Sequence, residues 1–238
     1  MLLGVIAAAT RQARTLPPRV LPPLLSASTV AGETSGGRGR RRLSLPDAEA
    51  TLLLGARLAE VCRAGDVVLL RGDYGAGKTC LARGFVRCWY NDPSELVTSP
   101  SYLIDNVYDD PDGIALQPRV AVHHMDLWRL PEGKIQELVN LEMVFTQCVS
   151  LIEWPDKLGA ELMPHEYLEI NLAILDEAEA EAEQAAAAAV ASDDENEDGY
   201  LEDDAEEKEL LQPRVATLTA YGDQWEERLA AICGEADS

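Results

Sequence analysis

The sequence predicts an α/β fold of the phosphate-loop nucleotide-binding type, in which a mixed sheet is flanked by helices. Three neighbouring features predict it. Residues 66–70, DVVLL, are a short apolar and β-branched run that indicates a buried strand. The next ten residues, RGDYGAGKTC, fit the pattern G-x-x-x-x-G-K-[ST], and apolar residues at helical spacing follow at Leu81, Phe85 and Trp89. Strand, glycine-rich loop and helix in this order are the context in which the pattern binds phosphate groups.

Residues 1–45 differ in composition from the rest of the chain. They contain seven arginines and one acidic residue, Glu33, and they are rich in Ala, Ser, Pro and Gly. This composition is typical of an organellar transit peptide, with processing near the RGRRR cluster at 38–42. It predicts import into a mitochondrion or a chloroplast, and a cytoplasmic protein with a disordered tail is the alternative. No apolar run reaches the ~20 residues that cross a bilayer, so no membrane segment is expected.

A helix is expected directly after this leader. Asp47 is a candidate N-cap, apolar residues at Leu54, Leu58 and Val61 follow helical spacing, and Gly65 is a candidate stop. The helix after the glycine-rich loop should end at Asp92-Pro93, because the residue before a proline disfavours helical backbone.

Two further strands are expected to end on acidic residues. Residues 119–128 are β-branched at first and reach Asp126, and residues 148–154 are a buried-looking strand that reaches Glu153. Residues 131–145 between them have the spacing of a helix. The carboxylates are therefore expected where strands leave the sheet.

The end of the chain predicts a hairpin with a greatly extended loop. Residues 166–174 and 213–222 alternate polar and apolar side chains, as half-exposed strands do, and a short amphipathic helix follows. Between the two strands, residues 176–209 hold sixteen acidic side chains against one lysine, a composition that cannot build a core. We therefore expect a folded core at 46–175, a disordered acidic insertion at 176–209, and a strand and helix at 210–238 that complete the core.

Charge and cysteine usage restrict the partners and the chemistry. The net charge is −22, and an acidic chain binds phosphate backbones poorly, so RNA is expected to be contacted only through a partner protein.

The five cysteines are odd in number and form no C-x-x-C pair. Reduced, mostly buried thiols are therefore expected, rather than a disulfide framework or a zinc site.

The glycine-rich loop carries the first group of candidate site residues. Gly72, Gly75 and Gly77 let backbone N–H groups turn towards a phosphate, and the start of the following helix adds its positive dipole end. Lys78 is placed to lie between the β- and γ-phosphates, and the Thr79 hydroxyl is placed to ligate Mg²⁺. A purely structural glycine-rich turn is the alternative.

Asp126 and Glu153 are the candidate acidic partners of this loop. Glu153 has the usual place of a carboxylate near the metal, and a solvated acid at a strand exit is the alternative. Asp126 could orient an attacking water or bind the metal through water, or it could instead cap a helix or pair with Arg129. His123 and His124 are adjacent on a strand and point to opposite faces, so a polar surface role is expected for them.

Four motifs in series resemble the TsaE (YjeE) family of small ATPases in the synthesis of threonylcarbamoyladenosine on tRNA. They are GDYGAGKT, TSPSY, HHMDLWRL and LIEWPDKL, and the resemblance covers 47–175 and resumes at 210–230. It implies a compact α/β fold and an ATP hydrolysis that is weak without partners. It also implies TsaD-type and TsaB-type partner subunits, which modify the adenosine at position 37 of tRNA and which the ATPase cycle resets between turnovers.

The resemblance also implies roles for particular residues. Lys78, Asp126 and Glu153 are the implied catalytic residues, and Thr79, Glu153 and Asp126 are the implied Mg²⁺ ligands. The implied ATP-binding residues are Thr51, Gly72, Asp73, Tyr74, Gly75, Ala76, Gly77, Lys78, Thr79, Cys80, Ser101 and Trp154. Three of these depart from the family pattern: Tyr74 replaces Leu, and Cys80 and Ser101 each replace Thr.

Two other function classes fit the phosphate loop. A small-molecule or nucleoside kinase needs an arginine-bearing lid over the transferred phosphate. The candidates for it after the loop, Arg83, Arg87, Arg119 and Arg129, are not clustered in the sequence. A nucleotide-sensing module without turnover is the third class.

Overall fold

The computed structural model describes residues 27–28, 39–110, 113, 115–176, 178–182 and 212–233. No helix in these ranges is long and apolar enough to cross a membrane. The named elements are β1 (Ala27–Ser28), β2 (Arg40–Leu45), α1 (Ala48–Val61), β3 (Val67–Arg71), α2 (Lys78–Trp89), β4 (Asp105–Tyr108), β5 (Val122–Asp126), the 3₁₀ turn η1 (Lys134–Glu137), α3 (Leu141–Gln147), β6 (Val149–Glu153), η2 (Pro155–Lys157), η3 (Ala160–Leu162), β7 (Tyr167–Ile174), β8 (Arg214–Tyr221) and α6 (Asp223–Cys233).

The described strands form one mixed sheet in the order β1-β2-β8-β7-β3-β6-β5-β4. The inner strands β7, β3, β6 and β5 run parallel, whereas β4, β8 and β1 pair antiparallel with their neighbours. The expected hairpin of β7 and β8 is confirmed, with Tyr167 opposite Tyr221 and Ile174 opposite Arg214. The predicted α/β fold with a mixed sheet flanked by helices is confirmed.

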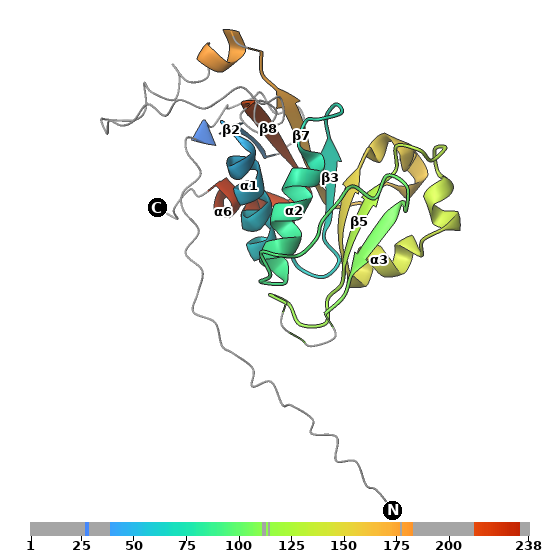
Figure 1. Ribbon diagram of the computed structural model, residues 1–238. Helices are drawn as coiled ribbons and strands as arrows, with labels where there is room; N and C mark the ends of the chain where they lie inside the picture. Colours follow the sequence, from blue (N-terminus) through green and yellow to red (C-terminus); the bar gives the residue numbers. More distant parts are fainter. Residues whose placement is uncertain are drawn as a thin grey trace, which may run out of the picture.

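Helices α1, α2 and α6 pack on one face of the sheet, and α3 lies on the other (Figure 1). Strand β3 shows why the centre of the sheet is buried on both faces. Its Val68 and Leu70 join the core with α1, α2 and α6, whereas Val67 and Leu69 join the core with α3. Because side chains alternate along a strand, a continuous apolar run is what this central position requires.

Two glycines allow α1 and α2 to approach closely. A Cβ on Gly55 would lie 2.1 Å from the carbonyl oxygen of Leu81, and one on Gly84 would lie 2.0 Å from that of Leu52. The predicted N-cap is confirmed, since the Asp47 side chain accepts a 2.7 Å hydrogen bond from the backbone N–H of Ala50. The close packing of α1 against α2 fixes the position of α2 on the sheet. The first turn of α2 contains the last residues of the glycine-rich motif.

The helix expected over 131–145 is wrong as a single element. The segment contains η1 and α3, separated by a short turn. Gly133 starts η1 from a left-handed conformation with φ 74°, and Asn140 caps α3 by accepting a 3.2 Å hydrogen bond from the N–H of Met143. Side-chain capping by asparagine interrupts the helix because it offers the backbone a competing partner.

The predicted start of the folded core at residue 46 is also wrong. Strand β2 is hydrogen-bonded to β8 over six residue pairs, from Arg40–Thr219 to Leu45–Arg214. Leu43 and Leu45 are 1% and 0% exposed. Processing inside the RGRRR cluster would therefore cut a strand of the sheet. The transit-peptide prediction for the rest of the leader falls on residues outside those described, apart from the short strand β1.

Residues 183–209 of the acidic insertion lie outside the described residues, as do residues 177, 210 and 211. Residues 178–182 are helical. The predicted disorder of this segment stays a prediction. All five cysteines lie in the described ranges, none is bridged to another, and four of them are buried, as expected.

Candidate nucleotide-binding site

The candidate residues gather where the parallel strands end. In the register of the sheet, Asp126 lies beside Glu153, and Glu153 lies beside Leu70 of β3. The glycine-rich loop follows β3 directly. Because adjacent parallel strands end at the same edge, the two carboxylates are presented next to the loop, as the sequence predicted.

The loop itself depends on glycine. Gly72, Gly75 and Gly77 have φ of 130°, 79° and 101°, a range that L side chains rarely adopt. A Cβ on Gly72 would also lie 2.3 Å from the carbonyl oxygen of Leu172. Gly77 is the N-cap of α2, so the loop leads straight into the helix N-terminus. The left-handed glycines and the loop-to-helix junction expected from the sequence are present.

Lys78 is folded back over the loop. Its Nζ donates 2.7 Å hydrogen bonds to the carbonyls of Gly72 and Asp73, and it lies 4.1 Å from the centroid of the Trp154 ring. Burial lowers the pKa of Lys78, and the negative charges of Glu153, Asp126 and Asp73 oppose that shift. The ammonium is therefore held between carboxylates, carbonyls and an aromatic face, close to where a phosphate would neutralise it.

Thr79 and Glu153 are in direct contact. The Thr79 hydroxyl donates a 2.8 Å hydrogen bond to Oε1 of Glu153, which is 3% exposed. The same oxygen lies 2.9 Å from Nε2 of His124. Strand β6 and the first turn of α2 are thus joined through one carboxylate.

Asp126 is buried and held by two donors. The Ser99 hydroxyl donates to its Oδ2 at 2.9 Å, and the backbone N–H of Trp128 donates to its Oδ1 at 3.0 Å. The latter bond closes a local turn, and no helix begins there, so Asp126 is not a helix cap. The alternative pairing with Arg129 is not seen, because the Nε of Arg129 donates to Ser101 instead, at 3.2 Å.

The segment before β4 reaches the site through Ser99 rather than Ser101. Ser101 is half-buried, bonds Arg129, and donates its backbone N–H to the Ser99 hydroxyl at 3.3 Å. No sequence signal separates these two serines, since each stands in the same short polar turn. The hydroxyl that contacts Asp126 therefore belongs to Ser99 and not to Ser101, the residue that the resemblance implied.

An aromatic pair lies beside the loop. Trp154 has a left-handed backbone with φ 58°, and its ring is 4.5 Å from that of Trp128 at an interplanar angle of 46°. Trp128 is 55% exposed. The Trp154 ring thus lies beside the loop, next to the Lys78 ammonium. Trp128 was not predicted.

The other candidates differ in access. Tyr74 is 94% exposed, whereas Thr51 is fully buried and donates its hydroxyl to the carbonyl of Asp47 at 3.2 Å. The Thr51 methyl packs beneath Gly77. Cys80 is half-buried, with its Sγ 3.6 Å from the carbonyl of Ala48, and burial raises its pKa. Asp73 and Ala76 are residues of the loop. The loop is expected to bind phosphate through its backbone N–H groups rather than through these two side chains.

The surface role expected for the two histidines is wrong. His124 is 0% exposed and contacts Glu153, and His123 is 7% exposed with its Nδ1 2.7 Å from Oδ2 of Asp105. Each imidazole is buried against a carboxylate, which compensates for the loss of water. The expectation that they point to opposite faces is correct, and it excludes a shared metal.

The oxygen donors at the loop suit Mg²⁺. The Thr79 hydroxyl and the carboxylates of Glu153 and Asp126 are hard ligands of the type that this ion prefers. No group of three or more His, Cys, Asp and Glu side chains in the described ranges is arranged to hold a metal alone. A cation at this position would thus need phosphate and water oxygens as well, which is the usual situation for Mg²⁺ at a nucleotide.

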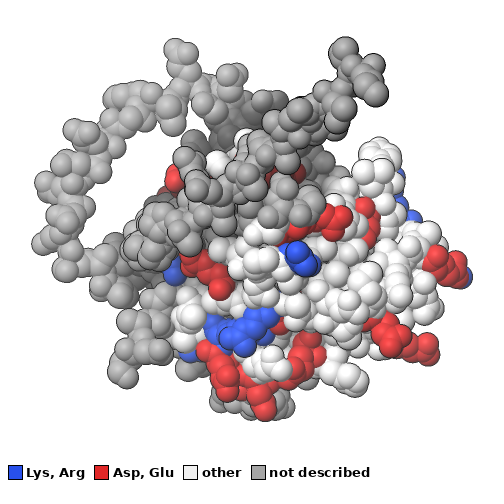
Figure 2. All heavy atoms as spheres, turned by 90° about the horizontal axis from the view of Figure 1, so that it is seen from below, with Lys and Arg blue, Asp and Glu red and all other residues white. Residues whose placement is uncertain are grey.

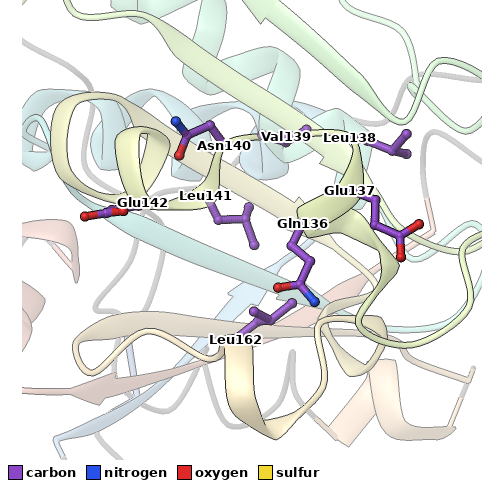
Figure 3. Close-up of a pocket in the computed structure, with 8 residues that line it drawn as sticks. All are labelled: Gln136, Glu137, Leu138, Val139, Asn140, Leu141, Glu142 and Leu162. Atoms are coloured by element: carbon purple, nitrogen blue, oxygen red, sulfur yellow. The ribbon is translucent and has the colours of Figure 1, made fainter.

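Two other surface features lie apart from these residues. A groove of about 470 Å³ between the η1–α3 turn and Leu162 is lined by Gln136, Glu137, Leu138, Val139, Asn140, Leu141, Glu142 and Leu162, none of them a predicted site residue (Figure 3). On the face shown in Figure 2, a small basic patch is bordered by acidic side chains.

Comparisons with known proteins agree with the geometry. The family described as threonylcarbamoyl adenosine biosynthesis protein TsaE matches residues 45–183. The TsaE protein of a Nostoc species is 32% identical over 146 residues, covering 59% of this chain and 83% of that protein. The Mycobacterium bovis TsaE protein is 34% identical over 152 residues, covering 60% and 82%. The crystal structure of Bacillus subtilis YdiB superposes with a TM-score of 0.55 at 22% identity, over 85% of this chain and all of that one. The chain belongs to the TsaE family.

Proposed function

We propose that the protein binds and hydrolyses ATP as a component of the machinery that forms threonylcarbamoyladenosine at position 37 of tRNA. The observation that carries this proposal is the meeting of Lys78, Thr79, Asp126 and Glu153 at one glycine-rich loop. The names of its relatives place them in the synthesis of this nucleoside. The function follows from combining the family with a site that has the groups for phosphate chemistry.

Each group has a separate task at this site. Backbone N–H groups of the loop and of the α2 N-terminus bind the phosphates, and Lys78 exchanges its carbonyl partners for phosphate oxygens. Thr79 and Glu153, with Asp126 nearby, would hold Mg²⁺, which supplies charge neutralisation at the phosphates. Asp126, fixed by Ser99 and by the Trp128 N–H, accepts a hydrogen bond from the attacking water and thereby orients it.

The kinase alternative is disfavoured by the positions of the arginines. Arg83 and Arg87 donate at 3.1 Å to the backbone carbonyls of Val97 and Glu95. Arg129 donates to Ser101 and lies over the ring of Tyr102. Each of these three is engaged in fixing a local segment, whereas an arginine-bearing lid needs several free to converge on one phosphate.

We infer that turnover is coupled to TsaD-type and TsaB-type subunits, and that tRNA is reached only through them. The acidity of the chain supports the second point. Organellar import by the segment before β2 is likewise a proposal, supported by its arginine-rich, acid-poor composition. Because β2 belongs to the sheet, cleavage in this scheme falls before Arg40.

The test is phosphate release by the purified protein, alone and with candidate TsaD-type and TsaB-type subunits. We expect slow release alone, faster release with the partners, and a large loss for Glu153→Gln and Asp126→Asn in both settings. The same reactions are scanned for a phosphorylated small molecule or nucleoside. Appearance of such an acceptor would establish the kinase alternative, and binding without turnover in every mixture would establish a sensing module.

A further inference from the structure

The neighbourhood of Glu153 contains a group to which the proposed function gives no role. We propose that His124 is a positioning residue, whose imidazole fixes the Glu153 carboxylate in the orientation needed for the metal. The inference rests on the proposed function, since it concerns the same site. It adds a second residue of β5, besides Asp126, to the machinery contributed by β5, β6 and α2.

The geometry concentrates both donors on one carboxylate oxygen. Oε1 of Glu153 accepts from the Thr79 hydroxyl at 2.8 Å and lies 2.9 Å from Nε2 of His124. Among the described residues no donor is bonded to the other oxygen, Oε2. The carboxylate is therefore held by one oxygen, while the second keeps its lone pairs for a cation or a water.

The ring's surroundings determine which nitrogen carries the proton. Nδ1 of His124 is buried and has no hydrogen-bond partner in the described part of the chain. A proton there would be a buried donor without an acceptor, which is unfavourable. The proton is accordingly on Nε2, from which it is donated to Glu153. His124 thus orients the carboxylate as an N–H donor from Nε2.

The backbone makes this contact rigid. His124 and Asp126 lie on the same face of β5, and the register pairs Asp126 with Glu153 and His124 with Leu151. The imidazole thus reaches Glu153 diagonally across two hydrogen-bonded strands, and it is 0% exposed. Outer partners of metal ligands typically alter metal affinity by about 10- to 100-fold when they are removed.

His123 provides a matched control. It is also buried, it also pairs with a carboxylate, at 2.7 Å from Asp105, and it is the next residue along the strand. It points to the opposite face of the sheet, away from Glu153. Replacing His123 removes a buried histidine–carboxylate pair but leaves the contacts of Glu153 in place.

The experiment measures ADP binding by calorimetry in Mg²⁺ and in EDTA, with the full-length chain. In His124→Leu, the ratio of the ADP affinity in Mg²⁺ to the ADP affinity in EDTA should fall about 10- to 100-fold. The ADP affinity in EDTA should stay within about twofold of the wild-type value. His124→Gln, which retains an N–H near the position of Nε2, should recover most of the Mg²⁺ effect, and His123→Leu should keep the wild-type ratio.

Distinct outcomes would overturn the inference. An unchanged Mg²⁺ effect in His124→Leu, or an equal loss in His123→Leu, would show that His124 does not position Glu153. If His124→Leu does not fold, His124→Gln and ¹⁵N spectra of the wild-type ring decide, because a proton on Nδ1 also overturns it. Failure of the wild type to bind ADP in either condition would instead refute the proposed function along with the inference.

Discussion

At the scale of single residues, the site is a set of polar side chains that each have a partner within the fold. Lys78 bonds loop carbonyls, Thr79 bonds Glu153, and Asp126 bonds Ser99. Binding of a phosphate must replace some of these contacts. Lys78, whose ammonium is partly buried, would exchange carbonyl partners for phosphate oxygens when a nucleotide binds.

The buried ammonium predicts a pH dependence of stability. The folded state lowers the pKa of Lys78, chiefly through burial, below the ordinary 10.5 that applies in the unfolded chain. The unfolded state then binds this proton more tightly, so the wild type gains stability as pH rises towards that value. Relative to Lys78→Met, its melting temperature without nucleotide should rise as the pH approaches 10.5 from below. A difference in melting temperature between the wild type and Lys78→Met that stays constant or falls with pH would contradict the account.

The two serines of the segment before β4 make a second prediction. Ser99→Ala removes a hydrogen bond to the Asp126 carboxylate, and a bond to a charged group is worth about 1.5–3 kcal/mol. Hydrolysis should therefore fall at least about tenfold while ATP affinity changes little. Ser101→Ala is the comparison, and its effect should be smaller because it contacts Arg129. A larger loss in Ser101→Ala would restore Ser101 as the working hydroxyl.

The sequence predicted those residues whose position follows from the backbone alone. Asp126 and Glu153 were found because strand ends meet at one edge of a parallel sheet, and the loop was found because its glycines and lysine have fixed spacing. The contacts of His124 and Trp128 were missed, because they depend on cross-strand register and on the left-handed backbone at Trp154. These properties come from tertiary packing rather than from any local pattern.

At the scale of elements, the position of the site depends on how α2 is fixed. The helix begins at Lys78 and runs along α1 with two glycines at the contact. Its first turn carries both Lys78 and Thr79. A shift of this helix would move both groups away from Glu153 together.

Gly84→Ala tests this packing. Alanine is the better helix former by about 1 kcal/mol, so an exposed site would gain stability. Here the new Cβ would lie 2.0 Å from the carbonyl of Leu52, and overpacking costs typically about 1–3 kcal/mol. Urea denaturation should show a net loss of stability, with a similar loss for Gly55→Ala. A gain in either variant would mean that the helices can separate without cost.

Helix boundaries show where element-level prediction fails. The predicted helix at 131–145 has the correct apolar spacing, yet Gly133 and the Asn140 cap divide it. Strand β2 was assigned to the leader because its three arginines dominate its composition. Its alternating Leu43 and Leu45, which are buried against α1 and β8, carried the opposite signal.

At the scale of the whole molecule, the N-terminal strand defines where the folded protein begins. A chain that starts at Gly39 keeps β2 intact, whereas one that starts at Pro46 loses six pairs with β8 and two buried leucines. Deleting a buried leucine side chain costs about 2–5 kcal/mol. The shorter chain should therefore unfold at much lower urea, and the longer should resemble the full chain. Equal urea midpoints for the two shortened chains would show that β2 does not stabilise the fold. Processing inside the arginine cluster would then leave the stability unchanged.

The central claim is that the glycine-rich loop binds ATP, and affinity measured by calorimetry on Lys78→Ala tests it most directly. Lys157→Ala is the control, a lysine of η2 at the same edge of the sheet but outside the loop. Losing the charged contacts of Lys78 to phosphate should weaken binding by at least about 1.5–3 kcal/mol, or roughly ten- to a hundredfold. Lys157→Ala should bind as the wild type does. Equal ATP affinity in Lys78→Ala and the wild type would contradict the account.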